Sequence, residues 1–338
     1  MTDAESGPSP AEVKAFQEDF VRLRDEIGKE VVGYSTIVER VLTCLFAGGH
    51  ALLEGVPGLG KTLLVRTLSR ALDVAFSRVQ FSPDLMPADI VGTQVLVLGD
   101  DGAKEFRFQK GPVFANVVLA DEINRATPKT QAALLEAMQE HSVTVGGTTH
   151  RLEEPFFVLG TQNPIDMEGT YPLPEAQVDR FLFKLMVGYL DEDDLLEVID
   201  RTTSRRTIEI EPVLRPERIE AMRATVRAVA VAEHVKRYAV RLAKATHPDS
   251  EHAPESVRRY VKFGTSPRGI LTLILAGKVR ALVDGRVHLS CEDVREVLKP
   301  ALRHRVILNF EGEAEGKQSD DLLDEVLASV DEAALVKS

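Results

Sequence analysis

The chain has 338 residues, of which 44% are hydrophobic and 28% charged, and its formal net charge is −12 at pH 7. Such a composition is ordinary for a soluble globular protein, and the length allows two or three folding units. No apolar run approaches the roughly 18 residues that a membrane span needs, so we expect no transmembrane helix. The negative charge argues against a general nucleic-acid coat protein, although it allows a local basic channel.

The beginning of the chain and its cysteines point to the cytoplasm. Residues 1–12 are polar and rich in Pro and Ser, so no secretory signal is expected. Cys44 and Cys291 are far apart in the sequence and lack the spacing of metal ligands, which predicts buried free thiols. Residues 311–338 carry nine acidic and two basic side chains and so supply most of the net charge.

Two helices are predicted before the first strand. Residues 1–10 are expected to be disordered, and residues 11–30 carry apolar side chains at helical spacing. A second helix is predicted over residues 35–47, where Gly48 and Gly49 end it.

A phosphate-binding loop is the most informative motif. Residues 55–62 match the pattern G-x-x-x-x-G-K-[ST], after a short apolar strand at 51–54 and before a helix that runs to about residue 72. A strand, a Gly-rich turn and a helix N-terminus direct backbone N–H groups and the helix dipole at an anion. Lys61 is expected to reach the β- and γ-phosphates, and the Thr62 hydroxyl to bind Mg²⁺. The candidate nucleotide-binding residues of the loop are Gly55, Pro57, Gly58, Leu59, Gly60, Lys61, Thr62 and Leu63.

The next segment combines a strand with a predicted hairpin. A strand is expected over residues 75–81, followed by one or two helical turns over 84–90. Residues 94–98 and 105–109 flank a Gly- and Asp-containing turn, which is a hairpin pattern. This hairpin interrupts what would otherwise be one helix connecting parallel strands.

An acidic pair follows a fully apolar strand. Residues 117–120 are all apolar, as expected at the centre of a parallel sheet, and Asp121 and Glu122 come directly after them. Because ligands bind at the carboxyl ends of such strands, Asp121 is expected beside Thr62 and Mg²⁺. Glu122 is expected to polarise a water for attack on the γ-phosphate. The alternative is a solvated acidic turn, which the phosphate-binding loop makes less favourable.

One more polar candidate, Asn163, follows later in the same fold unit. A helix that Thr127 and Pro128 open runs to about residue 140, and a second hairpin spans 143–152. Asn163 follows the buried strand at 156–159 and is expected to bind the γ-phosphate or the attacking water; otherwise it is a turn residue. The alternation of strands and helices predicts an α/β fold with a doubly wound parallel sheet.

Three arginines are candidates for contact with phosphate. Arg180 precedes the last strand, at 181–187, and is expected to reach a neighbouring subunit's site unless it pairs with Glu175 or Asp179. Arg268 begins a helix, where a cation opposes the dipole, so a phosphate or a carboxylate partner is expected. Arg125 is a second trans-acting arginine or a plain charge at a helix entry.

The remaining chain predicts a second, smaller domain. We expect an α/β core with its leading helix at 11–206, an all-helical domain at 207–310, and an acidic tail at 311–338 with one short amphipathic helix. A charged helix at 192–206 and an extended linker at 209–216 join the two domains.

Taken together, five segments resemble the MoxR family of AAA+ ATPases, over roughly residues 31–310. They are residues 49–62, 120–126, 160–164, 175–181 and 266–268. The resemblance implies ATP and Mg²⁺ as cofactors, a P-loop core, and the all-helical domain as an AAA+ lid. It implies that residues 93–109 are an insert within helix 2. It also assigns Asn163 as sensor 1, Arg180 as an arginine finger and Arg268 as sensor 2, acting in cis or in trans, with Val32 and Gly33 beside the adenine.

The activity implied is Mg²⁺-dependent ATP hydrolysis by a ring, expected to be a hexamer. By resemblance, ATP lies between core and lid, Arg180 of the next subunit completes the site, and the two hairpins transmit motion to a protein client. The family's chaperone-like remodelling role implies a partner with a von Willebrand A domain. The chain departs from the family at Tyr34, where Gln is usual, and at Gly269, where Ala is usual.

Three alternatives remain at this point. The ATPase subunit of a metal chelatase would be stimulated by a porphyrin-binding partner. A nucleic-acid motor is disfavoured because the hairpin tips are not strongly basic, so nucleic acid is an unexpected partner. A nucleotide-gated scaffold without turnover is disfavoured because both Glu122 and Arg180 are present.

Overall fold

A parallel sheet forms the centre of the fold. The computed structural model describes residues 7–56, 58–98, 104–164, 170–204 and 208–330. Pro57, the hairpin turn expected at 99–102, and most of the expected disordered N-terminus lie outside these residues. Five parallel strands have the order β2-β5-β8-β1-β9, which confirms the predicted doubly wound sheet. They are β1 (Ala51–Glu54), β2 (Phe76–Gln80), β5 (Val117–Asp121), β8 (Phe157–Gln162) and β9 (Phe183–Met186).

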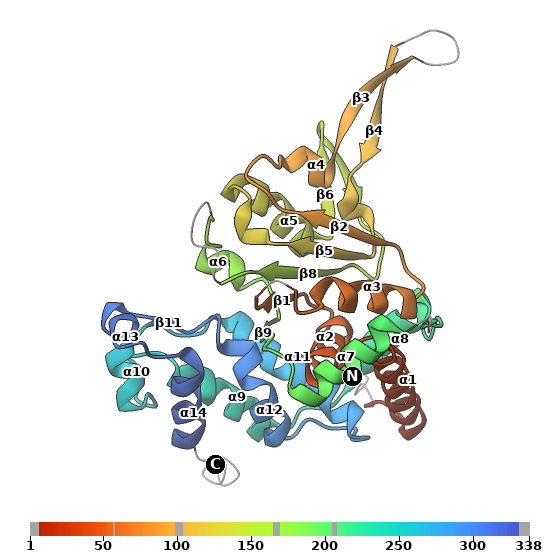
Figure 1. Ribbon diagram of the computed structural model, residues 1–338. Helices are drawn as coiled ribbons and strands as arrows, with labels where there is room; N and C mark the ends of the chain where they lie inside the picture. Colours follow the sequence, from red (N-terminus) through yellow and green to blue (C-terminus); the bar gives the residue numbers. More distant parts are fainter. Residues whose placement is uncertain (1–6, 57, 99–103, 165–169, 205–207, 331–338) are drawn as a thin grey trace, which may run out of the picture.

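Helices cover both faces of this sheet (Figure 1). Successive strand residues point to opposite faces, so the apolar strands contribute to two separate cores. Leu52, Val118 and Val158 pack with one set of helices, and their neighbours in sequence pack with the other. The first set includes α4 (Pro87–Val91) and α5 (Pro128–Glu140). The second includes α1 (Pro10–Gly28), α2 (Ser35–Ala47) and α3 (Lys61–Ala71).

Both predicted hairpins are present, and they touch each other. The first pairs β3 (Gly92–Leu98) with β4 (Lys104–Lys110), and the second pairs β6 (Ser142–Val145) with β7 (Thr148–Arg151). The imidazole of His150 stacks on the ring of Phe108, with centroids 4.0 Å apart. In Figure 1 the first hairpin projects well beyond the sheet, so its outer part is available for contacts with other molecules.

The segment after residue 208 is mainly helical but includes a short two-stranded sheet, β10 (Val261–Phe263) with β11 (Ile307–Leu308). It is therefore not the purely helical unit that we expected. The amphipathic helix expected in the acidic tail is α14, and its Leu322, Leu323 and Val326 are buried. The helices are α8 (Pro216–Ala228), α9 (Glu233–Ala245), α10 (Glu255–Tyr260), α11 (Pro267–Val283), α12 (Cys291–Leu302), α13 (Phe310–Ala314) and α14 (Ser319–Ser329).

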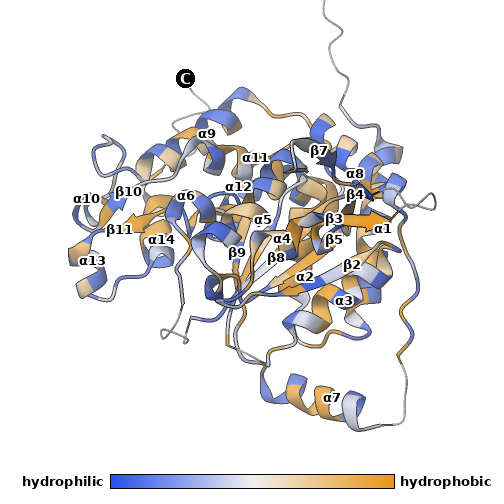
Figure 2. Cartoon of the chain, turned by 90° about the horizontal axis from the view of Figure 1, so that it is seen from above, coloured by the Kyte–Doolittle hydropathy of each residue, from blue (hydrophilic) through white to orange (hydrophobic). Residues whose placement is uncertain are grey.

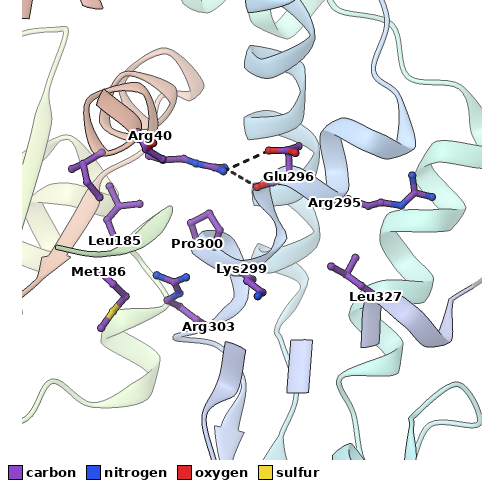
Figure 3. A pocket seen from close by; sticks show the side chains of 11 residues that line it. Arg40, Leu185, Met186, Arg295, Glu296, Lys299, Pro300, Arg303 and Leu327 are labelled. Carbon is purple, nitrogen blue, oxygen red and sulfur yellow. Dashed lines mark hydrogen bonds and ion pairs between the residues drawn. The ribbon is translucent and has the colours of Figure 1, made fainter. Parts of the chain in front are cut away.

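The helical segment packs directly on the sheet unit, and the two share one continuous hydrophobic core. One polar contact between them has a simple origin. Pro300 lies inside α12 and has no N–H, so the carbonyl of Glu296 loses its intrahelical donor. Arg40 of α2 donates to that carbonyl at 2.8 Å (Figure 3). A side chain of the sheet unit thus satisfies a backbone group of the helical unit.

Helix α7 (Glu192–Thr203) lies at the margin of the molecule (Figure 2). None of its residues is fully buried, although Leu195, Leu196 and Ile199 are apolar. The remaining short helices are η1 (Pro112–Phe114), η2 (Ile123–Arg125) and α6 (Glu175–Val178). Among the described residues, no helix combines the length and hydrophobicity that crossing a bilayer demands.

Candidate nucleotide-binding site

The loop between β1 and α3 has the backbone of an anion cradle. Gly58 and Gly60 have φ values of 85° and 75°, in the left-handed region that favours glycine, and Gly60 is the N-cap of α3. The first N–H groups of α3 therefore face the loop without intrahelical acceptors. Lys61 Nζ donates to the carbonyls of Gly55 and Val56, at 2.5 and 3.3 Å. Burial lowers the pKa of Lys61, and the carboxylates of Asp121, Glu122 and Glu54 oppose that effect.

A cavity of about 340 Å³ brings together seven of the predicted site residues. This volume suits a small ligand. It is bounded by the loop and by the carboxyl ends of β2, β5 and β8, which is the edge where such sheets bind ligands. The predicted residues that line it are Gly58, Gly60, Lys61, Thr62, Asp121, Glu122 and Asn163.

One hydroxyl contacts both acidic residues at the end of β5, Asp121 through its carboxylate and Glu122 through its backbone. Thr161 of β8 is 1% exposed and donates to Asp121 Oδ1 at 2.6 Å. The same hydroxyl oxygen accepts the N–H of Glu122 at 2.8 Å. Glu122 has φ 56° and ψ 50°, an uncommon conformation for a residue with a side chain, and such strain is concentrated at functional sites. Thr161 therefore orients the Asp121 carboxylate and fixes the backbone of Glu122.

Two residues of β2 that we had not predicted as site residues contact these carboxylates. Arg78 donates to Asp121 Oδ2 from Nε and one terminal nitrogen, at 3.1 and 2.7 Å. Gln80 Nε2 donates to Glu122 Oε2 at 2.9 Å. Alternation along β2 places Arg78 and Gln80 on one face, but only the pairing of β2 with β5, which the sequence analysis did not predict, brings them to the carboxylates. Arg125, left open in the sequence analysis, donates to Glu122 Oε2 at 3.1 Å.

A second cavity, of about 220 Å³, lies on the other side of the loop, and Gly58 and Gly60 border both cavities. Its walls are mostly apolar, as suits the flat face of a nucleobase. Tyr34 lines it and donates its hydroxyl to the carbonyl of Gly188 at 3.0 Å. Val32 and Gly33 were predicted to lie beside the adenine, and Val32 does line this cavity. Gly33 packs against Asp194 and Leu190 so closely that a Cβ would not fit. Leu59 and Leu63 also line it.

Helix α7, rather than the helical domain, forms the outer wall of this second cavity. Leu195, Val198 and Thr202 line it, and no lining residue comes from beyond residue 202. Arg201 ties α7 to the body by donating to the carbonyls of Gly28 and Lys29 at the end of α1, where a cation complements the helix dipole. The expectation that nucleotide lies between core and lid stays a prediction, because in this arrangement no described residue of the lid lines the second cavity. The helices after residue 208 pack on α1 and α2 instead.

Arg180 and Arg268 lie outside both cavities, and both are close to Asp179. Ser266 donates to Asp179 at 3.0 Å, and Arg268 lies 3.9 Å from the same carboxylate and 3.4 Å from Gln139. Arg305 forms the close ion pair with Asp179, at 2.7 Å. Among the described residues, no ion pair involves the Arg180 side chain, so the expected alternative of pairing with Glu175 or Asp179 is not realised there. Neither arginine lines the cavities beside the chain's own phosphate loop.

The residues of the first cavity fit a nucleotide that carries Mg²⁺. Magnesium takes few protein ligands and keeps phosphate oxygens and waters, which matches one hydroxyl, from Thr62, and one carboxylate, from Asp121. Within the described part of the chain, no group of three or more His, Cys, Asp or Glu side chains could form a dedicated metal cage. The site is therefore suited to a metal delivered with phosphate.

Known proteins resemble this chain over nearly its whole length. Residues 50–183 match the family described as "ATPase family associated with various cellular activities (AAA)", and residues 254–326 match the AAA lid domain. A protein named Chaperone MoxR1, from Mycobacterium tuberculosis, is 43% identical over 90% of this chain and 80% of its own length. Protein MoxR of Methylorubrum extorquens is 34% identical over 89% and 91%. The chain belongs to the MoxR family of AAA+ ATPases.

Two further similarities cover this MoxR-family chain more completely. YeaC of Bacillus subtilis, a protein without an assigned function, is 41% identical over 94% of this chain and 97% of its own. The crystal structure of a candidate ATPase from Cytophaga hutchinsonii superposes with a TM-score of 0.88, at 40% identity, over 95% and 97% of the two chains. The match to the lid continues to residue 326, inside α14, beyond residue 310 where we expected the tail to begin.

Proposed function

We propose that this protein hydrolyses ATP to ADP and phosphate in a Mg²⁺-dependent reaction. The observation that carries the proposal is the single cavity shared by Lys61, Thr62, Asp121, Glu122 and Asn163. It combines a phosphate cradle, a metal-binding pair and a carboxylate base, which are the parts that phosphoryl transfer to water needs.

Each residue has a distinct role in this proposal. Lys61 and the N–H groups at the start of α3 bind the β- and γ-phosphates, and Thr62 with Asp121 would hold Mg²⁺, which neutralises charge on those phosphates. Glu122 orients a water and accepts its proton during attack. Asn163, which is 7% exposed, donates to the γ-phosphate or to that water. The apolar cavity beside Tyr34 and α7 takes the adenine.

We further propose that the site is completed by a neighbouring copy in a ring, which we expect to be a hexamer. Arg268 lies beside Asp179, which precedes Arg180 in the sequence, and neither arginine lines the two cavities of its own chain. Each arginine is therefore available to a neighbour's γ-phosphate. A head-to-tail interface of this kind closes into a ring when the rotation that relates one subunit to the next is a whole fraction of 360°. Action in trans is the assignment that we propose for both arginines.

The work driven by hydrolysis is proposed to be remodelling of a protein client, in the cytoplasm, with a von Willebrand A domain protein as the partner. The name Chaperone MoxR1 of one relative supports a chaperone role. The projecting hairpin exposes Leu96, Leu98 and Phe106 to 55%, 72% and 73%, a surface suited to apolar protein contacts rather than to phosphates. These side chains favour a protein client over nucleic acid.

The test is ATP turnover by the purified full chain and by two variants. Wild type should release phosphate only when Mg²⁺ is present. Glu122→Gln should still bind ATP but lose turnover by about 100-fold or more, because the base is removed while the phosphate cradle is kept. Lys61→Ala should lose ATP binding itself. Near-normal turnover in Glu122→Gln would remove Glu122 as the base, and no turnover in any assembly of the wild type would refute the proposal.

A further inference from the structure

The two carboxylates of the site are joined by a chain of hydrogen bonds through β2. One terminal nitrogen of Arg78 donates both to Asp121 Oδ2, at 2.7 Å, and to Gln80 Oε1, at 2.8 Å. The amide nitrogen of Gln80 donates to Glu122 Oε2 at 2.9 Å. The path therefore runs from the proposed metal ligand to the proposed base without a gap.

Arg78 and a divalent cation need the same oxygen atom. Asp121 Oδ1 already accepts the Thr161 hydroxyl at 2.6 Å, so Oδ2 is the oxygen that faces Arg78. Asp121 is mostly buried, with 12% of its side chain exposed, whereas the Arg78 side chain is 48% exposed and can move into solvent. Two cations close to one carboxylate repel each other. A divalent cation bound at Asp121 therefore weakens the ion pair between Arg78 and Asp121.

Arg78 also determines which end of the Gln80 amide faces Glu122. An amide presents either its oxygen, an acceptor, or its nitrogen, a donor. Because Arg78 donates to Oε1 of Gln80, the nitrogen end is the one turned to Glu122. A reversed amide would place an acceptor against the carboxylate, which is unfavourable. Arg78 thereby fixes a donor on the carboxylate that serves as the base.

We propose that Arg78 is a positioning residue with two linked effects: it competes with the divalent cation for Asp121, and it orients Gln80 toward Glu122. This inference rests on the proposed ATPase function, because it deepens the roles of the same carboxylates. Arg125 provides a matched comparison. This arginine donates directly to Glu122, and within the described part of the chain it forms no hydrogen bond or ion pair with Asp121.

The first measurement is equilibrium binding of a fluorescent ADP analogue to the full chain, with Mg²⁺ and with EDTA. The preference for Mg²⁺ is the ratio of the Kd in EDTA to the Kd in Mg²⁺. Arg78→Gln should raise this ratio about fivefold to tenfold, since a charge-assisted competitor is removed. Arg125→Gln should leave the ratio at its wild-type value. Wild-type affinity of Arg78→Gln in EDTA shows that the phosphate loop is intact. An unchanged ratio in that variant would then overturn the proposed competition between Arg78 and Mg²⁺ for Asp121.

The second measurement is a double-mutant cycle on kcat at saturating Mg²⁺ and ATP. Gln80→Ala should lower kcat about fivefold and leave the Mg²⁺ preference unchanged. Adding Arg78→Gln to Gln80→Ala should lower kcat no further, because Arg78 acts on Glu122 only through Gln80. Additive losses would overturn the link.

Arg78→Lys gives an independent test if Arg78→Gln does not fold. A lysine keeps the charge beside Asp121 but lacks the fork that reaches two acceptors. It should therefore keep the wild-type Mg²⁺ preference and show the kcat of Gln80→Ala; wild-type kcat would overturn the orienting role. Loss of turnover in Glu122→Gln tests the ATPase proposal separately, so each idea can fail without the other.

Discussion

Arg40 donates a hydrogen bond of 2.8 Å to the backbone carbonyl of Glu296, the acceptor that Pro300 leaves without a helical partner. The contact borders a cavity of about 470 Å³ between α2, β9, α12 and α14 (Figure 3). The cations around this cavity are paired with carboxylates: Lys299 with Asp324 and Arg303 with Asp320. We therefore interpret this cavity as part of the joint between the sheet unit and the lid, and not as a second anion site.

The first prediction concerns the stability of that joint. Arg40→Ala should lower the free energy of unfolding by about 0.5–1.5 kcal/mol, because the carbonyl of Glu296 loses its donor. Pro300→Ala restores the N–H that bonds this carbonyl within α12, so Arg40→Ala should cost less in that background. Urea unfolding of the wild type, the two single variants and the double variant gives the coupling free energy between Arg40 and Pro300. Purely additive effects would show that Arg40 stabilises the chain by some other contact.

The second prediction concerns Thr161. Thr161→Val keeps the shape of the buried side chain but removes the hydroxyl that links Glu122 N–H to Asp121. We expect kcat to fall at least tenfold while ADP binding in EDTA stays near the wild-type value, because the change touches the carboxylates and not the phosphate loop. Thr161→Ser restores the donor and should recover most of kcat. A Ser variant as impaired as the Val variant would point to packing instead.

The third prediction separates the two faces of α7. The double variant Leu195→Ala/Val198→Ala removes apolar groups from the wall of the second cavity. It should weaken ADP binding about tenfold, as expected for several lost methyl and methylene contacts. Leu196→Ala/Ile199→Ala removes similar groups, which are 55% and 53% exposed and do not line the cavity. Equal losses in both double variants would argue against α7 as the base-binding wall.

Much of the fold could be predicted because its signals are local. The bounds of α2 were predicted to the residue, since apolar spacing and Gly48 define a helix without reference to the rest of the chain. The capping box of Ser290 and Asp293 at the start of α12 is a local signal of the same kind. Thr127 does occupy the N-cap of α5, but its hydroxyl meets that of Thr130 rather than a backbone N–H.

The features that we missed depend on contacts between distant segments. Arg78 and Gln80 matter only because β2 lies beside β5, forty residues on in the sequence. The position of the lid depends on how α11 packs against α1 and α2, which no local pattern encodes. The part that α7 plays in the wall of the second cavity was likewise not predicted, because it depends on how α7 packs against the loop after β1.

The fourth prediction is a loss of stability in mild acid. Burial lowers the pKa of His50 to about 4; its Nδ1 accepts Val158 N–H, so Nε2 donates to the Met138 carbonyl. Burial also holds the pKa of His304 well below its usual value. In the unfolded chain both titrate near pH 6.5, so the unfolded state binds more protons below that pH and stability falls as the pH drops from about 6.5 to 4.

The measurement for this fourth prediction is the free energy of unfolding at pH 7 and at pH 5. The two histidines together should remove about 2–4 kcal/mol between these values. His141 acts in the opposite direction, because its hydrogen bond with Glu154 raises its pKa, but it is partly exposed and its effect is smaller. His50→Gln should reduce the slope with pH. A slope unchanged in that variant would show that His50 is not held neutral.

The central claim is that a neighbour's arginine completes each ATP site, and mixing two inactive variants tests it most directly. Arg180→Ala subunits keep Glu122, and Glu122→Gln subunits keep Arg180. Each alone should lack turnover. In rings mixed one to one, about one interface in four joins an intact base to an intact arginine, so ATP hydrolysis should reappear. Pull-down through two different tags shows that mixed rings have formed. If these mixed rings stay inactive at every mixing ratio, the account is contradicted.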